Sequence, residues 1–214
     1  MNDKKTSRSP ATFINSVPIE VPLKMILVRL GYRKTKTMLS QKQRDTLDET
    51  ISDGFSLCKP QGCFRLMNIA EKKSDIIVLE DGSVLRSISL TELLHNSTAV
   101  AIMASTIGPE IVKAASDALT HGDGATAVIL DAVGGQSANE TLNWINEFIR
   151  SQLSRSTQKL TPHRFSPGFG DFDLENQKTI YSLLELDRLD LQLTSRYMLV
   201  PEKSVTAIAG IEKE

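Results

Sequence analysis

Apolar residues recur at helical spacing near the beginning of the chain. After Ser40 they fall every three or four positions, at Leu47, Ile51, Phe55 and Cys58. This spacing places them on one face of a helix. Ser40 and Gln43, three residues apart, are the pair found in a capping box, which satisfies the free backbone N–H groups at a helix start. The pattern therefore predicts an amphipathic helix over residues 41–57.

Strand-like patterns follow this helix. Two runs rich in β-branched residues, 76–80 and 83–88, flank Asp81-Gly82. This dipeptide favours a type I′ hairpin turn. Residues 98–104 form an uninterrupted apolar run bounded by polar residues, which is typical of a buried central strand. The sequence thus predicts a hairpin and a central strand of one sheet.

Helical spacing returns in the middle of the chain. Pro109 predicts the start of one helix, and residues 125–153 keep helical spacing across Gly134-Gly135. Two adjacent glycines cost a helix about 2 kcal/mol relative to alanines, so we expect a kink there, or another backbone close by. Asp131 and Glu140 lie on this long helix, and we interpret them as unrelated solvent-facing acids.

These elements predict an α+β protein, with a mixed, mainly antiparallel sheet flanked by helices that include one long helix. Residues 1–16 are polar and predict a flexible leader, and residues 17–214 predict a single domain. Hydrophobic residues make up 40% of the 214 residues and charged residues 24%, which is ordinary for a globular protein with a buried core. The net charge of −1 gives no electrostatic reason to expect nucleic acid or an anionic membrane as a partner.

The sequence favours a cytoplasmic location and gives little support for catalytic side chains. It contains no apolar run of 18 residues and no signal-peptide pattern. Cys58 and Cys63 are its only cysteines, and without a nearby histidine they cannot complete a zinc site, so we expect no metal. The three histidines are far apart, and no Ser, Cys or Lys lies in a known nucleophile motif. Catalytic residues therefore stay unassigned.

One segment, residues 163–172 (HRFSPGFGDF), has the composition of a ligand-binding loop. Its arginine carries a permanent charge in a fork suited to a carboxylate, and its phenylalanines offer flat apolar faces. Its proline fixes one backbone angle, while its glycines let backbone N–H groups approach a ligand. The candidate cofactor-binding residues are Arg164, Phe165, Pro167, Gly168, Phe169 and Gly170. The residues alone leave an alternative open, in which Arg164 pairs with Asp171 or Asp173 and braces a structural turn.

This loop, together with Lys203-Ser204-Val205 further on, resembles the C-terminal activation domain of cobalamin-dependent methionine synthase. The resemblance extends from about Val28 to Ile211 and is closer to short free-standing relatives of that domain. Within the family's Arg-x-x-Pro-Gly-Tyr loop, Arg164, Pro167 and Gly168 match, and Phe169 replaces the tyrosine. Beyond this point the two diverge, because the family continues with proline where this chain has glycine.

The resemblance implies that the protein helps to reactivate a corrinoid enzyme. In the family this domain binds S-adenosylmethionine, with the arginine of the loop at the amino-acid end, and acts beside cobalamin. We therefore expect a trans-acting component for reductive reactivation of cobalamin-dependent methionine synthase or a related corrinoid methyltransferase. S-adenosylmethionine would be the methyl donor, the partner would carry the cobalamin, and a flavodoxin-like protein would be the reductant. The protein would then serve methionine biosynthesis as part of a methyltransferase system.

A second hypothesis assigns no ligand to the protein. It would then be a docking partner of a corrinoid protein that keeps the fold and has lost S-adenosylmethionine binding. The sequence leaves both hypotheses open.

Overall fold

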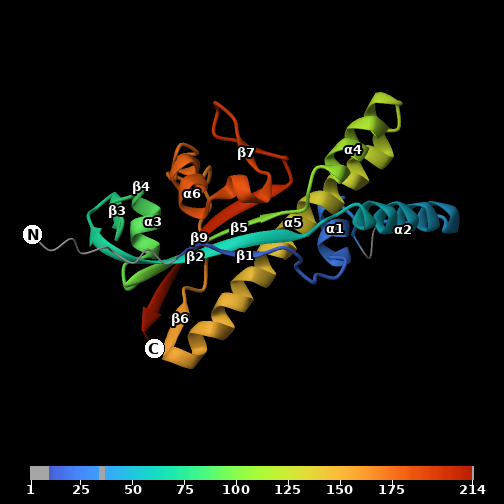
Figure 1. The fold of residues 1–214 in the computed structure, drawn as a ribbon. Helices are drawn as coiled ribbons and strands as arrows, with labels where there is room; N and C mark the ends of the chain where they lie inside the picture. The colour runs from blue at the N-terminus through green and yellow to red at the C-terminus, as the bar shows by residue number, and fades with distance from the viewer. Residues whose placement is uncertain (1–9, 34–36, 214) are drawn as a thin grey trace, which may run out of the picture.

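A computed structural model describes residues 10–33 and 37–213. Its centre is a seven-stranded sheet in the order β4-β3-β2-β5-β9-β6, with β1 also paired to β2 (Figure 1). The strands are β1 (Thr12–Ile14), β2 (Gln61–Lys72), β3 (Ile76–Leu79), β4 (Val84–Arg86), β5 (Ala99–Thr106), β6 (Gln158–Leu160) and β9 (Ser204–Lys213). A separate two-stranded ribbon consists of β7 (Gln192–Leu193) and β8 (Leu199–Val200).

Three long strands, β2, β5 and β9, form the middle of the sheet. β5 pairs along its whole length with both neighbours, so that Ile102 lies opposite Arg65 on one side and Ile208 on the other. All pairings among the described strands are antiparallel. The mainly antiparallel sheet predicted from the sequence is therefore confirmed.

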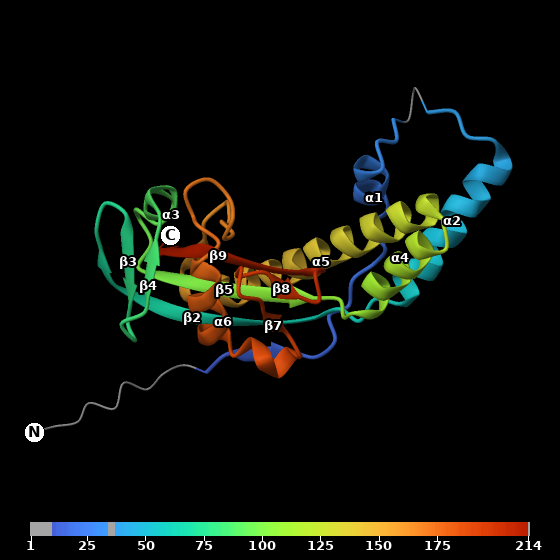
Figure 2. The same cartoon turned by 90° about the horizontal axis from the view of Figure 1, so that it is seen from above.

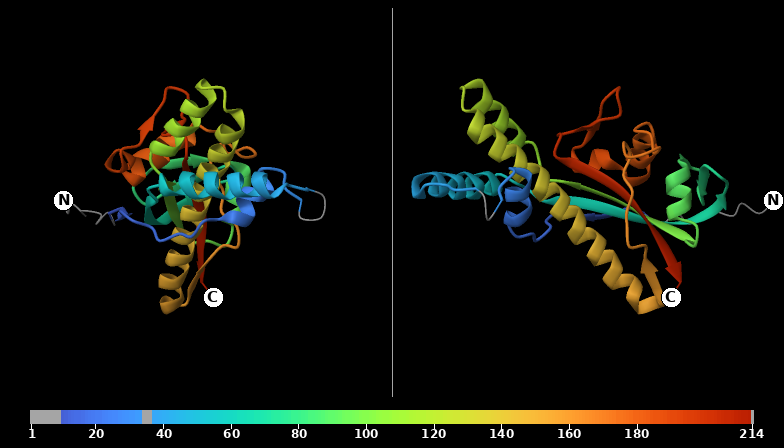
Figure 3. Two further views of the ribbon diagram at one scale, coloured as in Figure 1. Left: turned by 90° about the vertical axis from the view of Figure 1, so that its right-hand side faces the viewer. Right: turned by 180° about the vertical axis from the view of Figure 1, so that it is seen from behind.

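Helices cover both faces of the sheet and extend beyond one end of it. Helix α5 crosses one face, and α6 with the β7–β8 ribbon lies on the other (Figure 2). Helices α1, α2 and α4 gather around the beginning of α5, away from the sheet (Figure 3). The helices are α1 (Leu23–Arg29), α2 (Gln41–Ser56), α3 (Ile88–Leu93), α4 (Glu110–Thr120), α5 (Gly124–Leu153) and α6 (Asn176–Leu184), with short 3-10 helices η1 (Ser154–Ser156) and η2 (Leu186–Leu189).

The two faces of the sheet bury different side chains because successive residues of a strand point to opposite sides. Ile102 and Ile208 point toward α6 and join one core with Phe172, Ile180 and Leu184. Met103 and Ala207 point toward α5 and join another. The α5 side of that second core includes Leu142, Ile145, Ile149 and Leu153. A third cluster holds α1, α2 and α4 against the beginning of α5.

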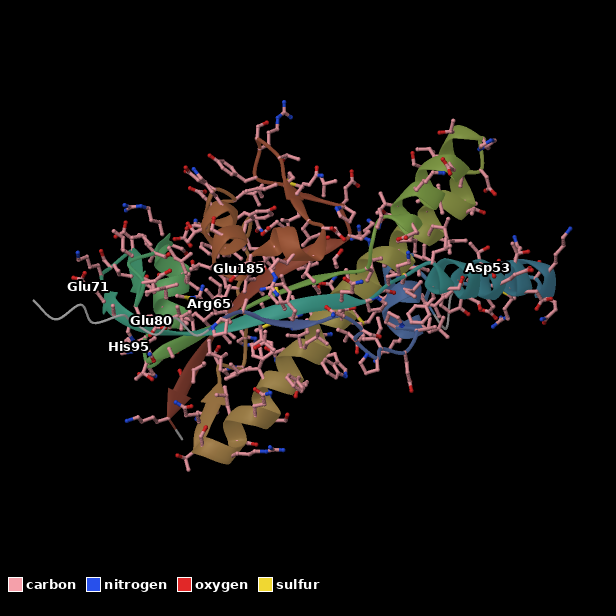
Figure 4. The ribbon with its side chains drawn as sticks, viewed as in Figure 1. Asp53, Arg65, Glu71, Glu80, His95 and Glu185 are labelled. Carbon is pink, nitrogen blue, oxygen red and sulfur yellow. The ribbon has the colours of Figure 1, made fainter. Side chains whose placement is uncertain are left out.

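A buried arginine fixes α6 to the sheet. Arg65 in β2 is only 7% exposed, and its guanidinium donates to the carbonyl of Leu183, in the last turn of α6, at 3.0 Å. A cation at the C-terminal end of a helix is favourable because the free carbonyls there carry partial negative charge. Figure 4 places Arg65 near Glu185 at this junction, with Asp53 of α2 at one end of the molecule and Glu71, Glu80 and His95 at the other. The end of α6 is therefore held against β2.

Several local predictions agree with the structure. The predicted helix over 41–57 is α2, and both hydrogen bonds of the Ser40–Gln43 capping box are present. The predicted central strand is β5, and the predicted long helix is α5. The hairpin of β3 and β4 also forms, but only Gly82 of the two turn residues has a positive φ. The turn is therefore not type I′, which requires a positive φ at both positions.

The predicted leader ends too late. Thr12–Ile14 form β1 and pair with β2 in register from Phe64 to Gly62, although residues 1–16 were expected to be flexible. Three residues within a polar segment are too short a pattern to predict a strand from the sequence. In the structure, β2 supplies the pairing that makes these residues a strand. Residues 1–9 and 214 lie outside the described part of the chain. Among the helices of residues 10–33 and 37–213, none has the length and apolar character needed to cross a membrane.

The glycine pair of α5 neither breaks nor ends the helix. A Cβ added at Gly134 would lie 3.1 Å from Cγ of Lys203, whereas nothing lies within 4 Å of one added at Gly135. Lys203 pairs with Asp131, one turn earlier on α5. The predicted close approach is therefore real at Gly134, but it involves a lysine side chain rather than a backbone. Asp131, interpreted from the sequence as an unrelated surface acid, has this specific partner.

Candidate functional site

The loop after β6 continues along the edge of β9. Phe165 and Ile208 exchange two backbone hydrogen bonds of 2.8 Å, so this part of the loop is extended like a strand. Adjacent residues of an extended chain point to opposite faces. Phe165 accordingly packs into the α6 core, and Arg164 reaches α5 on the other face. The six candidate residues are thus divided between two faces of the sheet.

On the α5 face, Arg164 takes part in a short polar chain. Its guanidinium donates to Oδ1 of Asn143 at 2.7 Å, and Nδ2 of Asn143 donates to Oε2 of Glu140 at 2.9 Å. Burial lowers the pKa of Arg164, and the negative charge of Glu140 opposes that shift. Arginine stays protonated at neutral pH even so. A cation and an anion therefore lie on the same surface, joined by a neutral amide.

On the α6 face, the backbone of residues 167–172 makes a tight bend. Gly168 and Gly170 have φ values of 90° and 55°, which other residues rarely adopt. The N–H of Gly168 donates to the carbonyl of Phe172 at 2.7 Å, and the N–H of Phe172 donates to that of Phe169 at 3.0 Å. The fully buried ring of Phe172 stacks on Phe165 with centroids 5.9 Å apart. Both glycines are needed for the bend itself.

The ring of Phe169 stands out from this bend. It is 67% exposed, which is unusual for so large an apolar side chain next to a core. It borders a hollow of about 140 Å³, whose other walls come from α6 and from residues 197–206. Ser166 and Pro167 also line this hollow, and Arg164 does not. The structure therefore separates the exposed aromatic ring from the guanidinium.

Asp171 anchors the loop to α3. Its carboxylate accepts hydrogen bonds from the hydroxyl of Ser87 at 2.9 Å and from the backbone N–H groups of Ile88 and Ser89. Hydrogen bonds from the side chains of Ser89 and Ser87 and from these N–H groups lower the pKa of Asp171 to about 2. Asp171 is therefore charged at neutral pH and holds the loop in place from the α6 side.

These contacts decide part of what the sequence left open. Arg164 donates to Asn143, and Asp171 binds the start of α3, so Arg164 does not pair with Asp171, one of the two partners that the open alternative named. The sequence reasoning missed Asn143 altogether and treated Glu140 as an isolated acid. Their three-residue spacing on a predicted helix was a usable signal, since such residues share a face. The binding roles of the six loop residues stay predictions.

The two cysteines lie apart from this site, Cys63 buried and Cys58 half-buried. Burial raises the pKa of the Cys63 thiol to about 12 and that of Cys58 to about 11. Both are therefore neutral at physiological pH and poor nucleophiles. Across residues 10–33 and 37–213, no three His, Cys, Asp or Glu side chains come together as metal ligands.

The arrangement of strands and helices defines the class of protein. It is an α+β domain with a curled antiparallel sheet, one long helix across one face and a loop that serves both faces. A crystal structure of the MetH reactivation domain bound to AdoHcy superposes on it with a TM-score of 0.60, covering 95% of this chain and 79% of that chain at 15% identity. The protein thus has the fold of the methionine synthase reactivation domain, and the resemblance seen in the sequence is confirmed at the level of the fold.

The two comparisons that use the amino-acid sequence alone give no match. A scan against models of protein families gives no match, and neither does a search of curated proteins. At 15% identity the structural likeness establishes architecture, and function has to be argued from the residues of this chain.

Proposed function

We propose that this protein is a cytoplasmic, trans-acting component for reductive reactivation of cobalamin-dependent methionine synthase, or of a related corrinoid methyltransferase, and that it binds S-adenosylmethionine. The observation that carries the proposal is the arrangement of Arg164, Asn143 and Glu140 on the α5 face. It supports binding of a zwitterion in a protein whose fold matches a reactivation domain bound to AdoHcy.

The amino-acid end of the ligand fits this polar chain. Arginine has five N–H donors, and the bond to Asn143 uses a neutral acceptor, which leaves the positive charge of Arg164 available to a carboxylate. The carboxylate of Glu140 provides the opposite charge for an ammonium group. Asn143 keeps the two charged groups of the protein apart, because it occupies the position between them. The donor set therefore suits an α-amino acid moiety.

The remaining loop residues have supporting roles in this proposal. Phe165 places Arg164 through its backbone bonds to Ile208 and its ring in the α6 core. Pro167, Gly168 and Gly170 shape the bend. The exposed ring of Phe169 lies on the α6 face, apart from Arg164, so it is not assigned a contact with a ligand held at Arg164. No side chain here is assigned as an acid, base or nucleophile.

The chemistry resides in the ligand and in the partner's cofactor. When bound, S-adenosylmethionine would supply a methyl group, and leave as S-adenosylhomocysteine, to a partner's cobalamin that a flavodoxin-like protein had reduced by one electron. The contribution of this chain is to bind the methyl donor and to orient it toward the partner, which raises the rate by fixing the reacting groups in position.

Calorimetry tests the ligand. We expect S-adenosylmethionine and S-adenosylhomocysteine to bind, and Arg164→Gln to weaken both by about tenfold to a hundredfold, as for the loss of a charge-assisted hydrogen bond. Glu140→Gln should weaken binding less, because it keeps the hydrogen bond from Asn143. Arg155→Gln, a neutralised arginine at an exposed position of η1, is the matched control and should bind normally. Absence of heat with the parent protein would remove the ligand from the proposal.

One observation favours the second candidate, a docking partner without ligand. Small-molecule sites usually enclose about 300–1,000 Å³, whereas the hollow beside the loop encloses about 140 Å³ and does not include Arg164. A pull-down with cobalamin-loaded methionine synthase separates the candidates. Capture that is independent of S-adenosylmethionine and unaffected by Arg164→Gln would support docking alone, and absence of capture would contradict both.

A further inference from the structure

A hollow of about 500 Å³ lies between the β7–β8 ribbon and one end of the sheet. Its volume falls within the range of about 300–1,000 Å³ that is usual for small-molecule sites. On the sheet side, Gln61 and Thr106 are cross-strand partners at the start of β2 and the end of β5. On the ribbon side, Gln192 of β7 is paired with Val200 of β8. None of the lining residues belongs to the loop of residues 163–172 or to the proposed S-adenosylmethionine site.

The charges in this hollow do not balance. Lys59 forms an ion pair with Glu110, in the first turn of α4, and the hydrogen bond from Lys59 lowers the pKa of Glu110. Glu110 is therefore ionised at neutral pH, and its charge is matched by the lysine. The other charged residue of the lining is Asp190, at the end of η2. Asp190 takes part in none of the ion pairs formed among residues 10–33 and 37–213, so the lining carries one unmatched negative charge.

The other walls offer apolar contact and neutral hydrogen-bonding groups. The apolar lining residues are Pro109, Leu189, Val200 and Pro201. Gln61 is half-buried and Gln192 is exposed, so a bound molecule can reach both side-chain amides. Each amide has a carbonyl oxygen that accepts hydrogen bonds. Donors on a ligand therefore find acceptors here, in addition to the carboxylate of Asp190.

We propose that this hollow binds a small organic cation of the aliphatic amine class, with its ammonium group at Asp190 and its hydrocarbon body against Leu189, Val200 and the two prolines. A cation is attracted by the unmatched carboxylate, whereas an anion would meet two carboxylates and a single lysine. The site goes beyond the proposed function and does not depend on it.

Three probes that share a six-membered aliphatic ring separate charge from shape. Cyclohexylammonium is the cation, cyclohexanol is the neutral analogue and cyclohexanecarboxylate is the anion. We expect cyclohexylammonium to bind with a Kd of roughly millimolar, since so small a ligand makes few contacts. Cyclohexanol should bind about threefold to fivefold more weakly, as for the loss of one exposed ion pair, and the carboxylate should bind most weakly of the three. The titrations are done at low ionic strength, because salt screens exposed charges.

Nuclear magnetic resonance on the full-length ¹⁵N-labelled chain locates the binding. Saturable shifts with cyclohexylammonium are expected at the backbone amides of Gly108, Asp190 and Gln192, which all line the hollow. Arg164→Gln should leave these shifts unchanged, so that failure of S-adenosylmethionine binding and failure of this site can be told apart.

Two substitutions should change binding of the cation in opposite directions. Asp190→Asn should weaken cyclohexylammonium by about threefold to fivefold, and asparagine tolerates the φ of 57° at this position. Lys59→Gln leaves Glu110 without its partner and should strengthen binding by a similar factor. Both variants should bind cyclohexanol as the parent does. The matched controls Asp187→Asn and Lys159→Gln, at exposed positions outside the hollow, should bind cyclohexylammonium normally.

Three results would each overturn the proposal. The first is the absence of a saturable shift at these amides with cyclohexylammonium. The second is equal binding of the three probes, which would show that charge does not select the ligand. The third is an unchanged affinity for cyclohexylammonium in Asp190→Asn, which would remove the carboxylate from the site.

Discussion

The loop of residues 163–172 makes different kinds of contact on the two faces of the central sheet. On the α6 face, the rings of Phe165 and Phe172 are stacked in a dry core, and Asp171 fixes the bend to the start of α3. On the α5 face, Arg164 lies in a polar chain with Asn143 and Glu140. Phe165 therefore holds the loop in place on the α6 face, whereas the side chain of the adjacent Arg164 points to the α5 face. The loop is thus anchored from one side of the sheet, and its charged residue lies on the other side.

The largest loss of stability is predicted at Phe172, which anchors the loop on the α6 face. Phe172→Ala should lower the free energy of unfolding by about 3–5 kcal/mol, because a fully buried ring is replaced by a cavity. Phe169→Ala, at the exposed ring of the same bend, should change it by less than about 0.5 kcal/mol. Urea denaturation of both variants measures the difference. Equal losses at the two positions would mean that the α6 face does not supply the anchor.

A smaller effect tests the contact between α5 and Lys203. Gly135→Ala should stabilise the protein by about 0.5–1 kcal/mol, because alanine is the better helix former and the added methyl group meets nothing. Gly134→Ala should lack this gain, because its methyl group would lie 3.1 Å from Cγ of Lys203. Chemical denaturation of the pair measures a difference of about 1 kcal/mol. The same gain at both glycines would show that Lys203 moves away freely.

The smallest effect is expected at Asp171, and it depends on pH. The pKa of Asp171 is about 2 in the folded protein, below the value of about 3.9 for a free aspartate. Its contribution to stability is therefore complete above about pH 4 and is lost as the pH falls toward 2. Asp171→Asn should lower the Tm by about 2–4 °C at neutral pH.

A pH series of thermal denaturation checks the sign of this effect. The difference in Tm between parent and Asp171→Asn should shrink as the pH falls from about 5 to 2. A difference that grows toward low pH would contradict the hydrogen bonding of Asp171 to the start of α3.

Local patterns in the sequence were enough for most of the fold. The capping box at Ser40 and the apolar run of β5 act within a few residues, so they could be recognised without a structure. The division of Arg164 and Phe165 between two faces could not, because it depends on pairing with Ile208, far away in the chain. β1 was missed for the same reason, since its strand character comes from β2.

The composition of the candidate site could be predicted from the sequence, but the hydrogen-bond partners of its charged residues could not. The sequence pointed to the loop because its glycines, proline and arginine are adjacent. The partners of the charged residues come from distant elements: Asn143 from α5 for Arg164, and the start of α3 for Asp171. The approach of Lys203 to Gly134 is likewise a contact between segments far apart in sequence.

The position of β9 bears on how the protein is made. This strand fills the place between β5 and β6, and residues 107–203 separate it in sequence from β5. While a ribosome is still translating that interval, one apolar edge of β5 has no partner and can pair with the wrong strand. Closure over so long a separation is slow, and partly folded chains that expose such an edge are prone to aggregate.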